Sequence, residues 1–236
     1  MKYNLHSADR KIYLSLLLVA VLLCTAHSQN REITYTNSKP IKENRYDDIK
    51  GNPMYFEDWV TGKIMRHDAL IYEDVVLNYN GYSRTFEIKT GDEMIELDGS
   101  VYLRVDVDAA DNPHAADRIP TEDFAFQKNL HSRFNDDFVI ILFAENDVML
   151  IKEFRVNIAK HTIQDVGKSI DFKDFNRKEL YYLKADGRLT PLRYKKKVIL
   201  NAFDKPEVES FISENKLRLK TEADLIALAR FYSTLN

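Results

Sequence analysis

The chain has 236 residues, with 34 lysines and arginines against 37 aspartates and glutamates, and a formal net charge of −3. This mild acidity argues against a nucleic acid as the main partner, because nucleic-acid-binding proteins usually carry a basic field. The single cysteine, Cys24, excludes an internal disulfide, so the fold needs an ordinary hydrophobic core. A chain of this length can bury about 70% of its unfolded surface, which is enough for one core.

Residues 1–28 have the features of a secretory signal peptide. A basic start precedes an apolar run over residues 12–24. This run is too short to span a bilayer, because a spanning helix needs about 20 apolar residues. Small residues at Ala26 and Ser28 then form a cleavage site, and we expect cleavage after Ser28. The sequence therefore predicts a protein exported to the periplasm or to the cell exterior.

The rest of the chain divides into three predicted parts. Residues 29–50 are polar and lack periodicity, which predicts a flexible lead-in. Period-two patterns predict an antiparallel β domain over residues 51–200, and a helical segment packed on the sheet is expected over residues 201–236. No later apolar run reaches membrane length, so no transmembrane segment is expected once the leader is removed.

The first clear hairpin is centred on Asn80-Gly81, a pair that readily adopts the positive φ angles of a two-residue type I′ turn. Such a turn sets Tyr79 opposite Tyr82. One face of the hairpin is then apolar, and alternation predicts that this face is buried. Its members are Val75, Leu77, Tyr79, Tyr82, Phe86 and Ile88.

Similar strands follow along the chain. A second hairpin is predicted around Asp98-Gly99. The apolar run over residues 138–144 is typical of a central strand covered on both faces, and an alternating apolar pattern comes after it. A last hairpin turns at Asp186-Gly187, where Pro191 marks the second strand as an edge.

The C-terminal part changes to a helical pattern. Asp204 can cap a helix that has Pro206 near its start and runs to about Asn215. Thr221 opens a second helix with an acidic first turn and one apolar stripe, which must be buried. The predicted fold is mainly β: an antiparallel meander sheet or a partly closed barrel, with two short C-terminal helices packed on the sheet.

The segments "NPMYFEDWVTGKI", "LYYLKADGRLTPLRYKKK" and "VESFISENKLRLKTEADLIALARFYSTL" are similar to a family of signal-peptide-bearing exported proteins from Bacteroidota. The resemblance covers about residues 50–236. It implies the same order of leader, β-rich middle, lysine-rich strand end and two short helices. It implies no assigned activity and no catalytic residues. Relatives often have a glycine in the first turn, where this chain has "RHDA" at residues 66–69, which leaves the geometry of that turn open.

A carboxylate cluster of Asp106, Asp108 and Asp111 follows a predicted strand. Clustered carboxylates on a loop can bind calcium, which takes six to eight oxygen ligands. The spacing does not match an EF-hand loop, so the alternatives are an irregular calcium site and a solvated acidic loop. The histidines lie far apart without zinc-type spacing, although His114 could join this loop as a ligand. No other cofactor is expected.

The one basic run of the mature chain lies on the last predicted hairpin. It can contact anionic lipid headgroups or acidic glycans. The alternative is a charged edge strand that discourages edge-to-edge aggregation. The residues of this predicted basic surface are Lys184, Arg188, Arg193, Lys195, Lys196 and Lys197.

Trp59, Tyr79 and Tyr82 are the candidates for a ligand-binding platform on which a sugar ring could stack. Such a platform needs aromatic side chains exposed on one flat face. The alternative is packing, with Tyr79 and Tyr82 as a cross-strand pair on the apolar face and Trp59 in the core.

The sequence has no GxSxG elbow, no cysteine after leader removal and no phosphate-binding glycine loop. The leading hypothesis is an exported, non-enzymatic binding or interaction module whose partner is an envelope component, a glycan or another protein. One alternative is a hydrolase of envelope or dietary glycans whose carboxylates converge only in the fold. Another is an envelope-associated structural protein that uses the basic hairpin.

Overall fold

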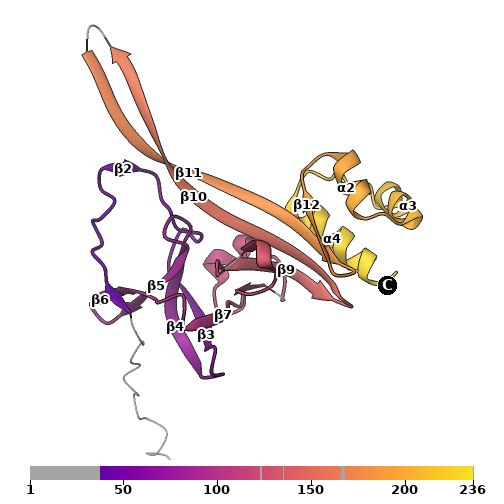
Figure 1. The fold of residues 1–236 in the computed structure, drawn as a ribbon, viewed down its shortest axis with the longest axis horizontal. Helices are drawn as coiled ribbons and strands as arrows, with labels where there is room; N and C mark the ends of the chain where they lie inside the picture. The colour runs from indigo at the N-terminus through magenta and orange to yellow at the C-terminus, as the bar shows by residue number, and fades with distance from the viewer. Residues whose placement is uncertain (1–37, 123, 135, 166–167, 236) are drawn as a thin grey trace, which may run out of the picture. The chain divides into compact units, whose positions relative to one another are not determined.

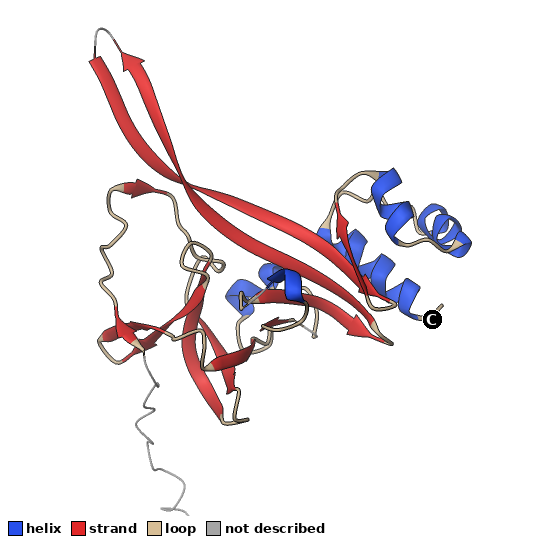
Figure 2. Ribbon diagram, viewed as in Figure 1, coloured by secondary structure: helices blue, strands red, loops and turns tan. Residues whose placement is uncertain are grey.

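The computed structural model describes residues 38–122, 124–134, 136–165 and 168–235. The predicted signal peptide, its cleavage after Ser28 and the first part of the predicted lead-in lie outside these residues. Twelve strands form one open, mostly antiparallel sheet, and helices follow it along the chain (Figure 1, Figure 2). The predicted mainly-β fold with C-terminal helices is confirmed. Since the described sheet is open, the barrel alternative is wrong.

The strand order is β1-β6-β5-β4-β3-β7-β8-β9-β10-β11-β12, and β2 pairs with β11 away from this path. β3 to β6 form one meander, β7 to β12 form a second, and pairing of β3 with β7 joins the two. The strands are β1 (Lys39–Pro40), β2 (Ile49–Lys50), β3 (Val60–Arg66), β4 (Ile71–Asn80), β5 (Thr85–Thr90), β6 (Glu93–Glu96), β7 (Tyr102–Asp106), β8 (Ala125–Gln127), β9 (Val139–Glu145), β10 (Val148–Asp165), β11 (Lys168–Ala185) and β12 (Arg188–Leu192).

The β4–β5 hairpin has a longer loop than the sequence predicts. Tyr79 pairs with Phe86, so the predicted Tyr79–Tyr82 pair is wrong. The reason lies at Asn80, whose buried side-chain oxygen accepts hydrogen bonds from the backbone N–H groups of Tyr82 (2.9 Å) and Ser83 (3.2 Å). This local turn competes with the two-residue type I′ turn. The register moves by an even number of residues, so the predicted apolar face is still buried except at the exposed Tyr82.

The second predicted hairpin, around Asp98-Gly99, is wrong. β6 turns back on β5 through Gly91-Asp92, where Thr90 pairs with Glu93, while β7 pairs with β3 and β8. Asp98 still forms a turn, because its carboxylate accepts from the backbone N–H of Ser100 (2.9 Å). That turn redirects the chain to another part of the sheet instead of folding it back on β6.

The later strands agree with the sequence. The first five residues of β9 are all buried, as expected for a central strand. The hairpin of β11 and β12 turns at Asp186-Gly187, where both residues have positive φ angles of 51° and 71°. Pro191 lies on β12, the terminal strand of the sheet, so its prediction as an edge-strand residue is confirmed.

Three α-helices, and not two, follow the sheet: α2 (Lys196–Ala202), α3 (Pro206–Glu214) and α4 (Glu222–Ser233). The lysine-rich segment predicted as a strand end forms the start of α2. The predicted second helix is α4, where Thr221 and Asp224 form a capping box. α4 packs on β9 and β10 through its buried residues Leu225, Ile226, Leu228, Ala229 and Tyr232. Two short 3-10 helices, η1 (Pro113–Arg118) and η2 (Ser132–Phe134), lie in the loops.

The core is built around a cluster of aromatic rings. Tyr55, Phe86 and Phe126 meet their neighbours edge to face, with ring centroids about 5 Å apart, for example 5.0 Å between Phe86 and Phe126. Such pairs add to the stability that burial of their area provides. The cluster consists of Tyr55, Phe56, Tyr79, Phe86, Phe124, Phe126, Phe138 and Phe154, all buried.

Residues 38–50, the described part of the predicted flexible lead-in, are paired with the sheet. β1 pairs with β6, and β2 pairs in parallel with β11. Between them Arg45 forms an ion pair with the buried Glu87. The described part of the lead-in therefore contacts polar residues of β4 and β5 and is held by two short strand pairings and this ion pair.

The turn between β3 and β4 is closed by Ala69, whose φ of 63° lies in the left-handed region. Its N–H donates to the carbonyl of Arg66 (3.1 Å). Glycine adopts this conformation without strain.

Candidate functional site

The long hairpin of β10 and β11 runs on past the strands that flank it (Figure 1). Its strands pair in unbroken register from Met149 opposite Lys184 to Asp165 opposite Lys168. β9 pairs with β10 only as far as Lys152, and β12 pairs with β11 only over residues 181–185. We call the outer part of the hairpin, residues 158–165 and 168–175, the arm.

The outer edge of β10 has unpaired backbone groups along the arm. The N–H of Val156 donates to the carbonyl of Gly81 (3.0 Å), so this residue directs its backbone away from β11. Backbone directions alternate along an antiparallel strand. Ile158, Lys160, Thr162 and Gln164 must therefore also direct their N–H and C=O groups outward. Beyond Val156, no strand of the described chain pairs with this edge.

The two faces of the arm differ in polarity. On one face Ile163 lies opposite Ile170, and their side chains are 51% and 52% exposed. Next to them the rings of His161 and Phe172 stack with centroids 5.0 Å apart. The opposite face is polar and internally hydrogen-bonded, for example from the Thr162 hydroxyl to Asp171 (2.7 Å). An exposed isoleucine pair beside an open strand edge is a surface on which another strand can add.

Near its base the arm already holds an added strand. β2 lies parallel to β11 at Lys173 and Asp174. The ammonium group of Lys173 forms an ion pair with Asp48 (2.6 Å), and the Lys50 ammonium lies 4.5 Å from the centre of the Phe172 ring. Main-chain pairing and flanking side chains thus fix an extended segment on this hairpin.

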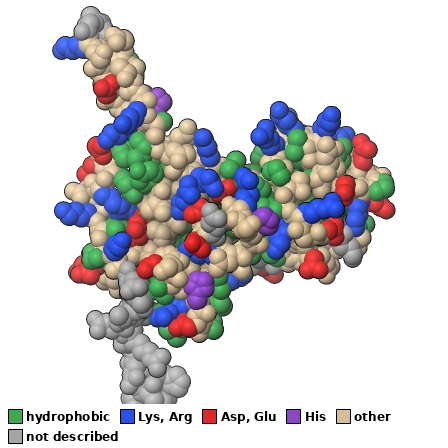
Figure 3. All heavy atoms as spheres, viewed as in Figure 1, with side chains coloured by type: hydrophobic (Ala, Val, Ile, Leu, Met, Phe, Trp, Pro, Cys, Tyr) green, Lys and Arg blue, Asp and Glu red, His purple; other side chains and the backbone are tan. Residues whose placement is uncertain are grey.

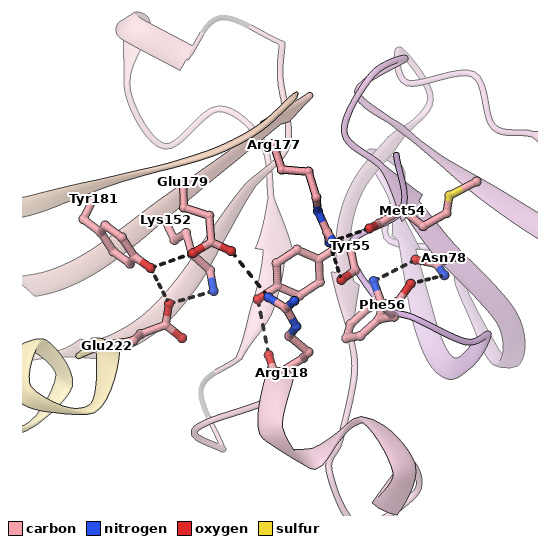
Figure 4. A network of polar contacts seen from close by, with 10 residues as sticks. All are labelled: Met54, Tyr55, Phe56, Asn78, Arg118, Lys152, Arg177, Glu179, Tyr181 and Glu222. Carbon is pink, nitrogen blue, oxygen red and sulfur yellow. Dashed lines mark hydrogen bonds and ion pairs between the residues drawn. The ribbon is translucent and has the colours of Figure 1, made fainter. Parts of the chain in front are cut away.

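A second feature, which we call the hollow, lies where α4 approaches β10 and β11 (Figure 4). It has a volume of about 460 Å³. The ammonium group of Lys152, a side chain only 3% exposed, lies 2.7 Å from a carboxylate oxygen of Glu222. The Tyr181 hydroxyl lies 3.0 Å from Glu222 and 3.0 Å from Glu179, and Arg118 lies 3.5 Å from Glu179.

The Tyr181 hydroxyl has one proton and two carboxylate neighbours. Burial, and then the charge of Glu222, raise the pKa of Tyr181 far above its ordinary value, so its hydroxyl keeps its proton. One proton cannot be donated to Glu179 and Glu222 at the same time. One of these two contacts therefore lacks a hydrogen bond unless another donor enters.

Glu179 and Glu222 converge as the hydrolase hypothesis requires. Each has an oxygen 3.0 Å from the Tyr181 hydroxyl, so these oxygens are at most about twice that distance apart. Retaining glycosidases place their two carboxyl groups about 5–5.5 Å apart. Here, however, the Tyr181 hydroxyl contacts both carboxylates.

The predicted aromatic platform does not form. Tyr79 is 1% exposed, its hydroxyl donates to the carbonyl of Phe138 (3.4 Å), and burial raises its pKa well above the ordinary value. It cannot contact a ligand, so its prediction is wrong. Tyr82 is exposed and packs edge-on against Tyr46, while Trp59 is half-buried.

The predicted calcium ligands do not form a metal site. Asp106 pairs with Arg104 (2.7 Å), and Asp108 accepts from the backbone N–H of Ala110 (2.8 Å). Within the described ranges, no group of three or more histidine, cysteine or acidic side chains could hold a metal ion. His114 points elsewhere, with its ring nitrogen 3.1 Å from the carbonyl oxygen of Trp59. The solvated acidic loop is the better interpretation.

The predicted basic surface is only partly exposed. Lys184 is half-buried and donates to the carbonyl of Leu130 (3.3 Å). Figure 3 shows lysine and arginine side chains along the part of the surface that carries α2. The exposed members of the predicted set are Arg188, Arg193, Lys195, Lys196 and Lys197.

If this surface meets anionic lipids, exchanging Lys195 and Lys197 together for glutamate should reduce retention on vesicles that contain phosphatidylserine. Each lysine near such a surface contributes about 1 kcal/mol. The thermal midpoint should not change, because both side chains are exposed. Cosedimentation measures retention, and Lys39→Glu plus Lys42→Glu is a control with the same charge change elsewhere. Equal retention of both double variants would end the membrane hypothesis.

None of the described helices combines the length and the apolarity needed to cross a membrane.

Glu179 and Glu222 were not among the predicted site residues, although alternation along β11 places Glu179 and Tyr181 on the same face. Comparison of the chain with protein-family models, with curated proteins and with solved structures gave no match, so the similarity to exported Bacteroidota proteins stays a prediction.

Proposed function

We propose that the protein is an exported, non-enzymatic binding module that holds an extended segment of a partner polypeptide on the outer edge of β10 in the arm. The observation that carries this proposal is the unpaired backbone edge over residues 158–164, next to the exposed pair of Ile163 and Ile170. Export rests on the predicted signal peptide over residues 1–28.

Addition of a strand satisfies both features of the arm. Main-chain hydrogen bonds to the outward N–H and C=O groups give affinity, and side chains at alternate positions give specificity. A two-stranded ribbon alone is only marginally stable in water, so a third strand also stabilises the arm. The parallel pairing of β2 with β11 is an example of the same interaction within the chain.

The charges of the arm favour an acidic partner segment. The carboxylates of Asp171 and Asp174 are in contact with Thr162 (2.7 Å) and His161 (2.9 Å) of the arm itself. The Lys160 side chain is exposed, and its ammonium group has no hydrogen bond or ion pair with the side chains of the described residues. A strand that alternates apolar residues with glutamate or aspartate would cover the isoleucines with one face and place a carboxylate near Lys160 on the other.

The proposal predicts that a blocked peptide of alternating valine and glutamate binds the purified protein, and that a peptide of alternating valine and lysine binds at least about tenfold more weakly. Fluorescence anisotropy of the labelled peptides measures both affinities. Exchanging Ile163 and Ile170 for threonine keeps β-branched side chains but removes apolar area, and should weaken binding of the acidic peptide. Equal binding of the two peptides would contradict the proposed charge preference.

A matched pair of variants at Thr162 tests the backbone edge itself. Thr162→Pro removes an N–H that points away from β11, so the hairpin keeps its own hydrogen bonds while the partner strand loses one. Thr162→Val removes the hydroxyl contact with Asp171 and keeps the N–H. We expect the proline variant to lose peptide binding and the valine variant to retain it. Equal affinities of the two variants would rule out strand addition on β10.

A further inference from the structure

The hollow shares no residue with the arm, and its chemistry points to a ligand of a different kind. Three basic side chains line it, and three acidic ones balance them. A ligand with a net charge of either sign would therefore meet repulsion as well as attraction. The basic side chains are those of Arg118, Lys152 and Lys220, and the acidic ones are those of Asp117, Glu179 and Glu222.

The polar groups of the hollow suit a ligand that donates and accepts hydrogen bonds. The side chains of Glu179 and Arg118 are 34% and 30% exposed, and the 3.5 Å contact between them is long. Since Tyr181 has one proton for two carboxylates, a hydroxyl of a ligand can donate a further hydrogen bond to Glu179, whose contact with Arg118 is long. The same hydroxyl can accept from Arg118. Alcohol groups of a polyol have both capacities.

An aromatic ring stands beside these groups. Tyr194 is 40% exposed and meets Tyr181 edge-on, with ring centroids 5.4 Å apart. An exposed ring can pack against the C–H face of a sugar while the hydroxyls of the sugar reach the carboxylates. The volume of about 460 Å³ is within the range of small-molecule sites.

We propose that the hollow binds a neutral saccharide, with the sugar face on Tyr194 and the sugar hydroxyls on Glu179 and Arg118. This goes beyond the proposed function, because it concerns a different site and a different class of ligand.

Calorimetric titration of the purified protein with cellotetraose, maltotetraose and tetra-N-acetylchitotetraose tests this site, with trigalacturonate as the charged comparison. We expect at least one neutral sugar to bind and trigalacturonate to bind at least about tenfold more weakly. Absence of binding to all three neutral sugars, or tighter binding of trigalacturonate, would overturn the proposal. Release of reducing ends from a bound sugar would replace it with hydrolysis.

Two variants at Tyr194 separate stacking from general damage. Tyr194→Phe keeps the ring and should bind the same sugar within about twofold, whereas Tyr194→Ala should bind it about tenfold more weakly. Both should melt close to the parent, since the ring is exposed. Glu179→Gln should also weaken binding. Parental affinity in Tyr194→Ala would exclude the hollow, and Thr162→Pro in the arm should leave sugar binding unchanged.

Discussion

Replacing Gly81 by alanine is expected to lower the free energy of unfolding by about 3 kcal/mol, because the added methyl group has no room. A Cβ at this position would lie 2.5 Å from a ring carbon of Phe154 and 2.8 Å from a methyl group of Val156. The backbone cannot move aside, since the Gly81 N–H donates to the carbonyl of Pro53 (2.9 Å) and its carbonyl accepts from Val156 (3.0 Å).

Urea unfolding followed by circular dichroism measures this loss as a lower midpoint at constant slope. Gly91→Ala is the matched control. No atom lies within 4 Å of a Cβ at Gly91, but its φ of 58° makes alanine unfavourable there by about 1 kcal/mol. If the Gly81 variant is no less stable than the Gly91 variant, then Phe154 and Val156 of β10 do not pack closely against position 81.

Gly81 illustrates what a sequence can and cannot reveal. The Asn80-Gly81 pair correctly predicts a hairpin at this position. Alternation also predicts the buried face correctly, because an even shift in register leaves every side chain on the same face of the sheet. The glycine is not needed for a positive φ, because the residue of this loop with positive φ is Arg84. It is needed because Phe154 and Val156 lie too close to position 81 for a Cβ atom. That contact joins residues more than 70 positions apart, so no local pattern contains it.

The choice of strand partners is beyond local patterns for the same reason. Asp98-Gly99 and Gly91-Asp92 both have turn chemistry, yet only the second closes a hairpin. After the Asp98-Gly99 turn the chain does not return to β6, because β7 pairs with β3 on one side and β8 on the other. This choice of partner strands depends on residues far from the turn, so the sequence of the turn does not indicate it.

The two candidate sites, the arm and the hollow, also depend on contacts that local sequence patterns do not contain. The alternation in the sequence predicts only the first part of β10 and the last part of β11, so the arm is not predicted, and the absence of flanking strands becomes visible only in the fold. The hollow requires more, since Glu179 lies on β11 and Glu222 opens α4. Packing of α4 on β9 and β10 brings the two carboxylates to one hydroxyl group.

Replacing Glu222 by glutamine is expected to lower the free energy of unfolding by about 3 kcal/mol, because it leaves the Lys152 ammonium buried without its carboxylate. The reverse change, Lys152→Met, should be milder, at about 1–2 kcal/mol. The Glu222 side chain is 22% exposed and keeps the Tyr181 hydroxyl as a donor, so its charge remains partly solvated.

The two changes together close a double-mutant cycle. With methionine at position 152 the buried ammonium group beside Glu222 is gone, so Glu222→Gln should then have almost no effect, and the coupling free energy should be about 2 kcal/mol or more. Urea midpoints of the four proteins give this value. Additive losses would mean that the ammonium group finds another acceptor or water in the hollow. The ion pair would then not contribute to the packing of α4 on the sheet. The positions of the side chains from which the saccharide site is inferred would then not depend on it.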